Sequence, residues 1–321
     1  MKLLPADIYY QQLVQHLNRA QKDIVLAAMV CYFEPGMEKL FAALEASAAR
    51  GVKIHIIIDA YNDFLFSQDF NFFKARAYKQ RIRATNNKLQ KLAAQGVAIT
   101  RLGSVGINPF KGRFHQKVSL IDDVVFFAGG VNLTHESFLN NDYMLFIKDA
   151  TLARRLNEYY DNEVKTNESF TYEISPSHTL LIDGGKPNES IIYQRAIELS
   201  TRAKRITYVS QMAPSGPLAG LLAAKHATIY TNRVAQLLSP AAIDQLAFFL
   251  RYRLANSYQK EQFLHAKYLL FELESGERKL LSGSHNFSYR GVRYGTHELA
   301  LESSDASLYA EFAQFGKDNL T

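Results

Sequence analysis

Two segments of the chain repeat one order of reactive side chains: an imidazole, an ammonium group, a carboxylate and an amide. In this order they are His115, Lys117, Asp122 and Asn132 in the first segment, and His265, Lys267, Glu272 and Asn286 in the second. Two such segments facing each other could form a site for a phosphate diester. One histidine would attack the phosphorus and the other would protonate the leaving group.

Alternate residues of a β-strand point to the same side, so the histidine and the lysine of each segment would face one pocket. A neutral histidine can displace an alcohol from phosphorus and form a phosphohistidine. The second histidine can protonate the departing oxygen and then deprotonate the incoming alcohol or water. Because the protein would supply the cations, we expect neither a metal ion nor a cofactor. The groups expected to hold the phosphoryl oxygens are the two lysines with Asn132, Asn286, Gly130 and Ser284.

Further carboxylates could orient the histidines. Asp142 follows the first segment and Glu298 follows the second. A carboxylate bonded to one ring nitrogen fixes the tautomer, so we expect each acid to serve the histidine of one half. The motif carboxylates Asp122 and Glu272 belong to the catalytic set, where we expect them to fix a loop or pair with a lysine. Three more histidines flank the motifs and could contact substrate: His135, His285 and His297.

A chance origin of the motif has to be weighed against a functional one. A single His-x-Lys pair on a strand is a common occurrence and usually lies on a solvated edge. The second copy, in the same order within a repeated plan, favours function. By contrast, His55 alternates with isoleucines and is expected at a packing or solvent position. The single cysteine, Cys31, excludes an intrachain disulfide and is expected to be buried in its apolar run.

The composition is that of a globular protein with an anionic partner. Of the 321 residues, 47% are hydrophobic and 21% are charged, and the net charge is +6. An excess of cations favours a phospholipid head group or a nucleic acid without choosing between them. No apolar run approaches the roughly 20 residues of a membrane-spanning helix, and the N-terminus lacks a signal-peptide pattern. We therefore expect a cytoplasmic protein that can lie on a membrane surface.

Apolar periodicity predicts an α/β protein with two similar halves, residues 1–165 and 179–321, joined through the polar stretch 166–178. Hairpins are expected to turn at residues 122–123 and 275–276. One predicted helix, opened by Pro240, carries Ile243, Ala247, Leu250 and Leu254 on one face. The strands predicted in the first half are 53–59, 97–101, 117–121, 124–128 and 143–147, with a helix at 152–164. The second half is predicted to contain strands 205–210, 227–231, 265–274, 279–282 and 297–302, with helices at 191–200 and 218–224.

The twin motifs resemble those of the phospholipase D superfamily, whose mark is a repeated His-x-Lys-x4-Asp pattern. The flanking residues, such as those from Asn132 to Tyr143 and from Gly283 to Arg290, are similar to cardiolipin synthases and phosphatidylglycerophosphate synthases of that superfamily. The resemblance implies a fold of two pseudo-symmetric α-β-α halves, each with a mixed, largely parallel sheet flanked by helices. It also implies ping-pong transfer with His115 as nucleophile and His265 as general acid and base.

The second motif departs from the superfamily pattern in two ways. Glu272 replaces the usual aspartate, and four extra residues precede Gly283. A hairpin turn at residues 275–278 could absorb the extra residues without moving the site. We therefore expect an active site in spite of both departures.

The substrate class must be judged outside the motifs. Residues 64–91 combine clustered phenylalanines with seven cations, which suits insertion at an anionic membrane surface. The same residues could form a lid packed on the second half, or stack on bases and bind phosphates of a nucleic acid. We expect a phosphatidyltransferase or phospholipase D that takes a phospholipid and an alcohol acceptor at the inner face of the membrane. The alternatives are a metal-independent nuclease or phosphodiesterase, and a binding module without activity.

Overall fold

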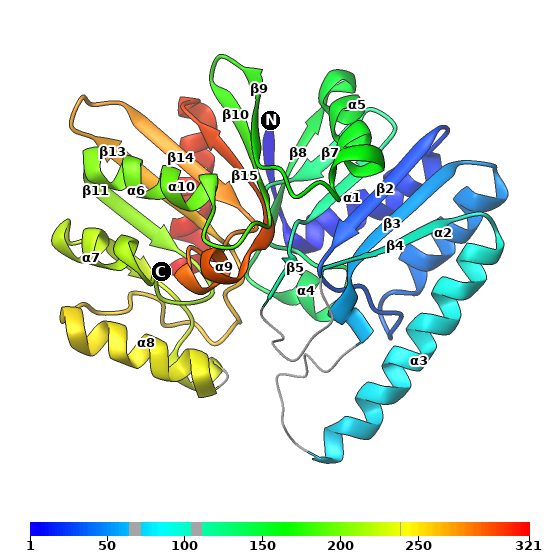
Figure 1. Ribbon diagram of the computed structural model, residues 1–321, viewed down its shortest axis with the longest axis horizontal. Coiled ribbons are helices and arrows are strands. Elements are labelled where there is room, and N and C mark those ends of the chain that lie inside the picture. Colours follow the sequence, from blue (N-terminus) through cyan, green and yellow to red (C-terminus); the bar gives the residue numbers. More distant parts are fainter. Residues whose placement is uncertain (64–71, 104–110, 238) are drawn as a thin grey trace.

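The computed structural model describes residues 1–63, 72–103, 111–237 and 239–321, which form two mixed sheets flanked by helices (Figure 1). The first sheet has the strand order β1-β8-β7-β6-β2-β3-β4. Its strands are β1 (Lys2–Pro5), β2 (Asp23–Ala28), β3 (Lys53–Asp59), β4 (Ala98–Leu102), β6 (Val118–Ile121), β7 (Val124–Phe127) and β8 (Tyr143–Lys148). The helices of this half are α1 (Ala6–Arg19), α2 (Glu38–Ala49), α3 (Phe72–Ala94), α4 (His135–Leu139) and α5 (Ala150–Glu158).

The second sheet has the order β12-β11-β13-β14-β15-β10-β9, and β5 joins it beside β15. Its strands are β5 (Arg113–Phe114), β9 (Phe170–Ser175), β10 (His178–Gly184), β11 (Ala203–Val209), β12 (Thr228–Tyr230), β13 (Tyr268–Leu273), β14 (Arg278–Gly283) and β15 (Thr296–Ser303). Its helices are α6 (Ile191–Arg202), α7 (Pro217–Ala224), α8 (Ser239–Tyr252), α9 (Tyr289–Tyr294) and α10 (Ala306–Leu320). Short 3-10 or π turns complete the described elements: η1 (Ala60–Asp63), η2 (Tyr159–Glu163) and η3 (Val234–Gln236).

The two sheets follow one plan, which confirms the predicted repeat. In each, a strand that starts a βα unit pairs in parallel with the next strand and antiparallel with the motif hairpin. Thus Ile24 of β2 faces Ile121 of β6, and Ile206 of β11 faces Phe271 of β13. The predicted hairpin turns are also confirmed, because β6–β7 and β13–β14 are antiparallel neighbours.

The mixed sheets were predicted correctly, but the expectation that they are largely parallel was wrong. In the described residues, antiparallel pairings predominate in both sheets. The reason is the short connection between consecutive motif strands. A tight turn can join only antiparallel neighbours, whereas a parallel pair needs a crossover such as α2 between β2 and β3.

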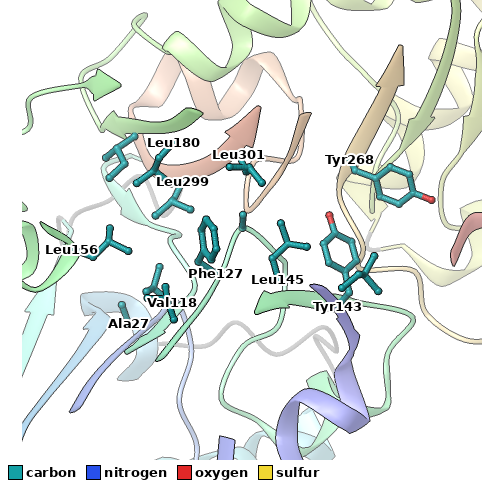
Figure 2. Close-up of a cluster of buried hydrophobic side chains, with 14 of the residues drawn as sticks. Ala27, Val118, Phe127, Tyr143, Leu145, Leu156, Leu180, Tyr268, Leu299 and Leu301 are labelled. Carbon is teal, nitrogen blue, oxygen red and sulfur yellow. The ribbon is translucent and has the colours of Figure 1, made fainter. Parts of the chain in front are cut away.

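A hydrophobic core lies between the two sheets and joins the halves. Strand β2 shows how the sequence directs side chains to both of its faces: Val25 and Ala27 enter this central core, whereas Leu26 packs beneath α1 and α2. Figure 2 shows Phe127 and Leu145 from the first half close to Leu299 and Leu301 from the second. The halves therefore share one interior, which fixes the position of one motif relative to the other.

The stretch 166–178, expected to be a polar junction, contains strand β9. Its side chains alternate between more and less exposed positions, and Phe170 and Tyr172 pack on the central core. The second sheet therefore begins before residue 179. Two other predictions concern burial: Cys31 is buried, as expected, and His55 bonds to Thr100 Oγ1 at 2.9 Å in its partly buried strand position.

Candidate active site

Each His-x-Lys segment pairs with the backbone of the other half before it enters its own sheet. The His115 backbone N–H donates to the His297 carbonyl at 2.9 Å, continuing the pairing of β5 with β15. In the same way, the His265 N–H donates to the Asn141 carbonyl at 2.9 Å, next to a bridge between Asn141 and Leu264. The two histidines are therefore placed by backbone pairing across the boundary between the halves.

This crossing pairs each histidine with a carboxylate from the opposite half. His115 Nδ1 lies 2.9 Å from Glu298 Oε2, although these residues are 183 positions apart in the sequence. His265 Nδ1 lies 2.7 Å from Asp142 Oδ2, across 123 positions. When Nδ1–H donates to the carboxylate, the lone pair stays on Nε2. Both rings thus have the tautomer that a nucleophile or a general base needs.

Burial keeps both imidazoles neutral. It lowers the pKa of His115 well below its usual range, and the Lys117 and Lys267 charges lower it further. Burial, followed by the Lys267 charge, lowers the pKa of His265 to about 4, although hydrogen bonding to Asp142 opposes this shift. The lysine of the second motif acts on the histidines of both motifs, so the two segments form one electrostatic cluster.

The two lysines are buried and face back toward their own histidines. Lys117 Nζ donates to the His115 carbonyl at 2.6 Å, and Lys267 Nζ donates to the His265 carbonyl. Burial lowers the pKa of Lys117 well below its usual range and that of Lys267 to about 8, while the charges of Glu298 and Asp142 oppose these shifts. At neutral pH Lys267 therefore still carries a positive charge, which can interact with a phosphoryl oxygen.

The predicted phosphate-binding residues have different surroundings. Asn132 Oδ1 accepts from the Val30 N–H at 3.4 Å, whereas Asn286 Oδ1 is buried with no partner in the part of the chain that the structure describes. Ser284 Oγ donates to the Glu298 carboxylate and accepts from the Leu299 N–H at 3.0 Å. A Cβ at Gly130 would lie 2.6 Å from Asp142 Oδ2. Gly130 and Ser284 therefore contact the carboxylates behind the histidines.

The motif carboxylates Asp122 and Glu272 point away from this cluster. Asp122 follows strand β6 and accepts hydrogen bonds from the backbone N–H groups of residues 21, 22 and 23 at 2.8–3.2 Å. Glu272 contacts Arg205 at 3.6 Å and Arg278 at 4.0 Å. A strand rises about 3.3 Å per residue, so five residues place each carboxylate roughly 16 Å beyond its lysine. Asp122 fixes a loop, as one expectation had it, but Glu272 pairs with arginines instead of a lysine.

Two further residues, to which the motifs assign no role, hold the two segments in place. Gln116 lies between His115 and Lys117 and points to the opposite side, where its amide binds the Tyr159 and Tyr160 hydroxyls at 2.9 Å. Tyr143 donates to the Lys267 carbonyl at 2.9 Å and so supports the second motif from the first half. For Gln116, its polar side chain between the motif histidine and lysine was a sequence feature that could have indicated a supporting role. For Tyr143 there was no local signal.

The three flanking histidines differ in their hydrogen-bond partners and surroundings. His285 Nδ1 accepts from the Phe287 N–H at 2.8 Å, and burial lowers the pKa of this ring to about 4. The His297 ring is also buried, which lowers its pKa to about 4, and its Nδ1 has no partner within the described ranges. The His135 backbone N–H donates to the Glu34 carboxylate, and the His135 ring packs against Gly36. Over those ranges, no group of three or more His, Cys, Asp or Glu residues is arranged to hold a metal ion.

The twin motifs, the two mixed sheets and the shared interior define a phospholipase D-like protein, and comparison with known proteins agrees. Residues 13–164 match the family model described as "Cardiolipin synthase, PLD-like domain". The first half of the chain is thus similar to the phospholipase D-like domain of cardiolipin synthases.

Curated proteins with similar sequences are also cardiolipin synthases. Over 172 residues, or 53% of this chain, the sequence is 27% identical to the probable cardiolipin synthase YwiE of Bacillus subtilis, covering 29% of that protein. Over 134 residues, or 40% of this chain, it is 28% identical to cardiolipin synthase B of Escherichia coli K12, covering 28% of that protein. The matched region therefore spans less than a third of the length of each relative.

Solved structures extend the similarity of fold to nearly the whole chain. Phosphatidylserine synthase of Haemophilus influenzae superposes with a TM-score of 0.74 at 12% identity, covering 98% of this chain and 85% of that one. Polyphosphate kinase of Porphyromonas gingivalis superposes with a TM-score of 0.62 at 14% identity, covering 98% of this chain and 46% of that one. At these identities the likeness concerns the fold.

Proposed function

We propose that the protein is a phospholipid phosphatidyltransferase of the phospholipase D type, which transfers a phosphatidyl group through a phosphohistidine. The observation that carries this proposal is the pair of buried histidines, each bonded through Nδ1 to a carboxylate of the opposite half. The similarity to cardiolipin synthases supports a phospholipid as the phosphatidyl donor.

In the first step, His115 Nε2 attacks the phosphorus of the donor. A P–N bond forms, the P–O bond to the leaving group breaks, and His265 gives its proton to the departing oxygen. His265 must be protonated for this step. The negative charge of the bound phosphate favours that state, because an opposite charge nearby raises the pKa of a histidine.

In the second step, His265 deprotonates the acceptor hydroxyl, whose oxygen attacks the same phosphorus while the P–N bond breaks. An alcohol acceptor gives a new phospholipid and water gives phosphatidic acid. Glu298 stabilises the positive charge that develops on His115 during attack, and Lys117 and Lys267 offset the charge of the phosphoryl oxygens. The alcohol is not specified by these groups, because any hydroxyl can attack a phosphohistidine.

Contact with the inner face of a membrane is part of the same proposal, because the substrate is a lipid and the net charge is +6. Within the described ranges, no helix has both the length and the hydropathy needed to cross a bilayer.

In the basic stretch 64–91, which was expected at that membrane surface, some cations form ion pairs within the protein and others are exposed. Its residues 64–71 lie outside the described ones. Further along α3, Arg81 contacts Glu34 at 3.1 Å and Lys88 contacts Glu45 at 2.6 Å. This part of α3 packs on α2 and β4 of its own half, and Lys79, Arg83 and Lys91 remain exposed. Those three exposed cations are therefore available to an anionic surface.

The direct test is incubation with a panel of phospholipid donors and alcohols, with products identified by mass spectrometry. Transfer of a phosphatidyl group by the wild type, and its loss in His115→Ala, is the expected result. Cleavage of single-stranded DNA without added metal, with no lipid turnover, would replace the proposal with the nuclease alternative. If no phosphodiester is turned over, the remaining alternative is a binding module without catalytic activity.

A further inference from the structure

Helix α8 exposes an apolar stripe to solvent. Ile243, Leu246 and Leu250 are 67%, 49% and 71% exposed, and their spacing places them on one face of the helix. The opposite face packs on the protein, where Gln245 is buried and Phe248 joins Ala213 in a small cluster. The helical periodicity was predicted, but the stripe it creates faces away from the core. Adjacent large apolar side chains on one exposed helix face are a feature of interaction surfaces.

Cations border this stripe. On a helical projection, Arg251 in the last turn of α8 lies beside the three apolar residues, and Arg253 follows one residue beyond the end of the helix. Both arginines are exposed. The single acidic residue of α8 is Asp244, which is 2.5 Å from Arg290 Nη2 and therefore neutralised. The surface thus combines exposed hydrocarbon with a net positive charge.

A cavity of about 700 Å³ opens beside α8 and adds to this charge. Its walls include Arg251 of α8 and Arg293 of α9, together with Ser288 and Tyr289. Ser288 and Tyr289 follow Asn286 closely in the sequence, and the Tyr289 N–H donates to Ser215 Oγ at 2.8 Å. The cavity therefore lies next to the segment that leaves the second motif. In Figure 1, α8 is the yellow helix at the edge of the second half.

We propose that α8 is a docking surface for an anionic phospholipid bilayer. Ile243, Leu246 and Leu250 enter the boundary between head groups and acyl chains, while Arg251 and Arg253 contact lipid phosphates. This proposal rests on the proposed function, since it brings a lipid substrate to the enzyme. A second copy of the chain is a less suitable occupant, because a two-fold contact through α8 would place Arg251 and Arg253 against the same positive surface.

The experiment is vesicle cosedimentation with the full chain. Vesicles of phosphatidylcholine alone are compared with an equimolar mixture of phosphatidylcholine and phosphatidylglycerol, at low and high salt. The variant Ile243→Ser/Leu246→Ser/Leu250→Ser is expected to bind the mixed vesicles at least tenfold more weakly than the wild type. The variant Arg251→Gln/Arg253→Gln is expected to lose most of the preference for anionic vesicles and most of the salt dependence.

A matched control carries the same kind of change at exposed apolar positions elsewhere. Ile8, Leu139 and Val234 are 37%, 60% and 41% exposed, and their replacement by serine should leave vesicle binding unchanged. Thermal unfolding verifies that both triple variants fold. Equal vesicle binding by the α8 variant and the wild type overturns the proposal. So does a wild-type dimer that the α8 variant dissociates without a change in vesicle binding, because the stripe would then belong to a second copy.

The docking proposal and the proposed function can fail separately. Vesicle binding is measured without turnover and should be the same in His115→Ala as in the wild type. Hydrolysis of a soluble diester, bis(p-nitrophenyl) phosphate, is measured in the α8 variant and should be unchanged. Binding that depends on α8 without any lipid turnover rejects the function and keeps the docking surface. Turnover of vesicle lipid that does not depend on α8 rejects the docking surface and keeps the proposed function.

Discussion

The crossed pairing of histidines and carboxylates predicts a specific defect in Glu298→Gln. The substitution keeps the size of the side chain and a hydrogen bond to His115 but removes the negative charge. Attack on phosphorus places positive charge on the His115 ring, whose Nδ1 lies 2.9 Å from Glu298 Oε2. Formation of the covalent intermediate should therefore slow, although Glu298 lies in the half that does not carry His115.

The size of the defect follows from that distance. At an effective dielectric constant of about 20, two full charges 2.9 Å apart interact by about 6 kcal/mol. With about half of the charge developed in the transition state, and a neutral hydrogen bond retained, the loss is about 2–3 kcal/mol. Since 1.36 kcal/mol is a factor of ten in rate, intermediate formation should slow by roughly 30- to 150-fold.

The assay is rapid-quench measurement of covalent intermediate formation with a labelled donor. Glu302→Gln is the matched control: its carboxylate is buried on the same strand, β15, but contacts Arg195 instead of a histidine. This control should form the intermediate at nearly the wild-type rate. Wild-type kinetics in Glu298→Gln, together with loss of the intermediate in Asp142→Asn, would refute the assignment and make His265 the nucleophile.

The remaining predictions concern pH, packing and the support of the second motif. Lys267 loses its charge above its pKa of about 8, so turnover of a soluble diester should fall as the pH rises through 8; a flat profile up to pH 9.5 would contradict this. Burial holds the pKa of His265 and His285 below the unfolded value of about 6.5. Stability, measured by denaturant unfolding, should therefore decrease as the pH falls from 6.5 toward 4, by up to about 1.4 kcal/mol per pH unit for each ring. Gly130→Ala places a Cβ against Asp142 and should lower turnover at least tenfold with the fold retained, as seen by circular dichroism. Tyr143→Phe removes the bond to the Lys267 carbonyl and should cost about 1–2 kcal/mol in the free energy of unfolding.

Local sequence was sufficient for the motif strands and their turns. Val118–Ile121 and Val124–Phe127 are short apolar runs separated by two aspartates, a pattern typical of a hairpin. Asp122 adopts a φ of 54° in that turn, a conformation that aspartate tolerates better than most residues. Such features depend on neighbours in the chain and can be predicted without the tertiary structure.

The crossed contacts could not be predicted in this way. Which acid reaches which histidine depends on β5, a two-residue strand that pairs with β15 in the other half. A strand this short has no recognisable periodicity. The direction of an amphipathic helix is likewise undetermined by its sequence, and Leu250 of α8 therefore faces solvent although its spacing suits a core. Strand β9 did carry an alternating pattern, but its polar residues favoured the interpretation as a linker.

The most direct test of the central claim is to locate the covalent intermediate. His265→Asn should remove the general acid and base needed for its breakdown, so a labelled phosphatidyl donor with a good leaving group should accumulate on the enzyme. Mass spectrometry of peptides prepared at neutral pH then identifies the modified residue. The crossed-site mechanism predicts a phosphatidyl adduct on His115 that is absent from His115→Asn. An adduct on another residue, or turnover of the donor by the wild type with no adduct in His265→Asn, would contradict it.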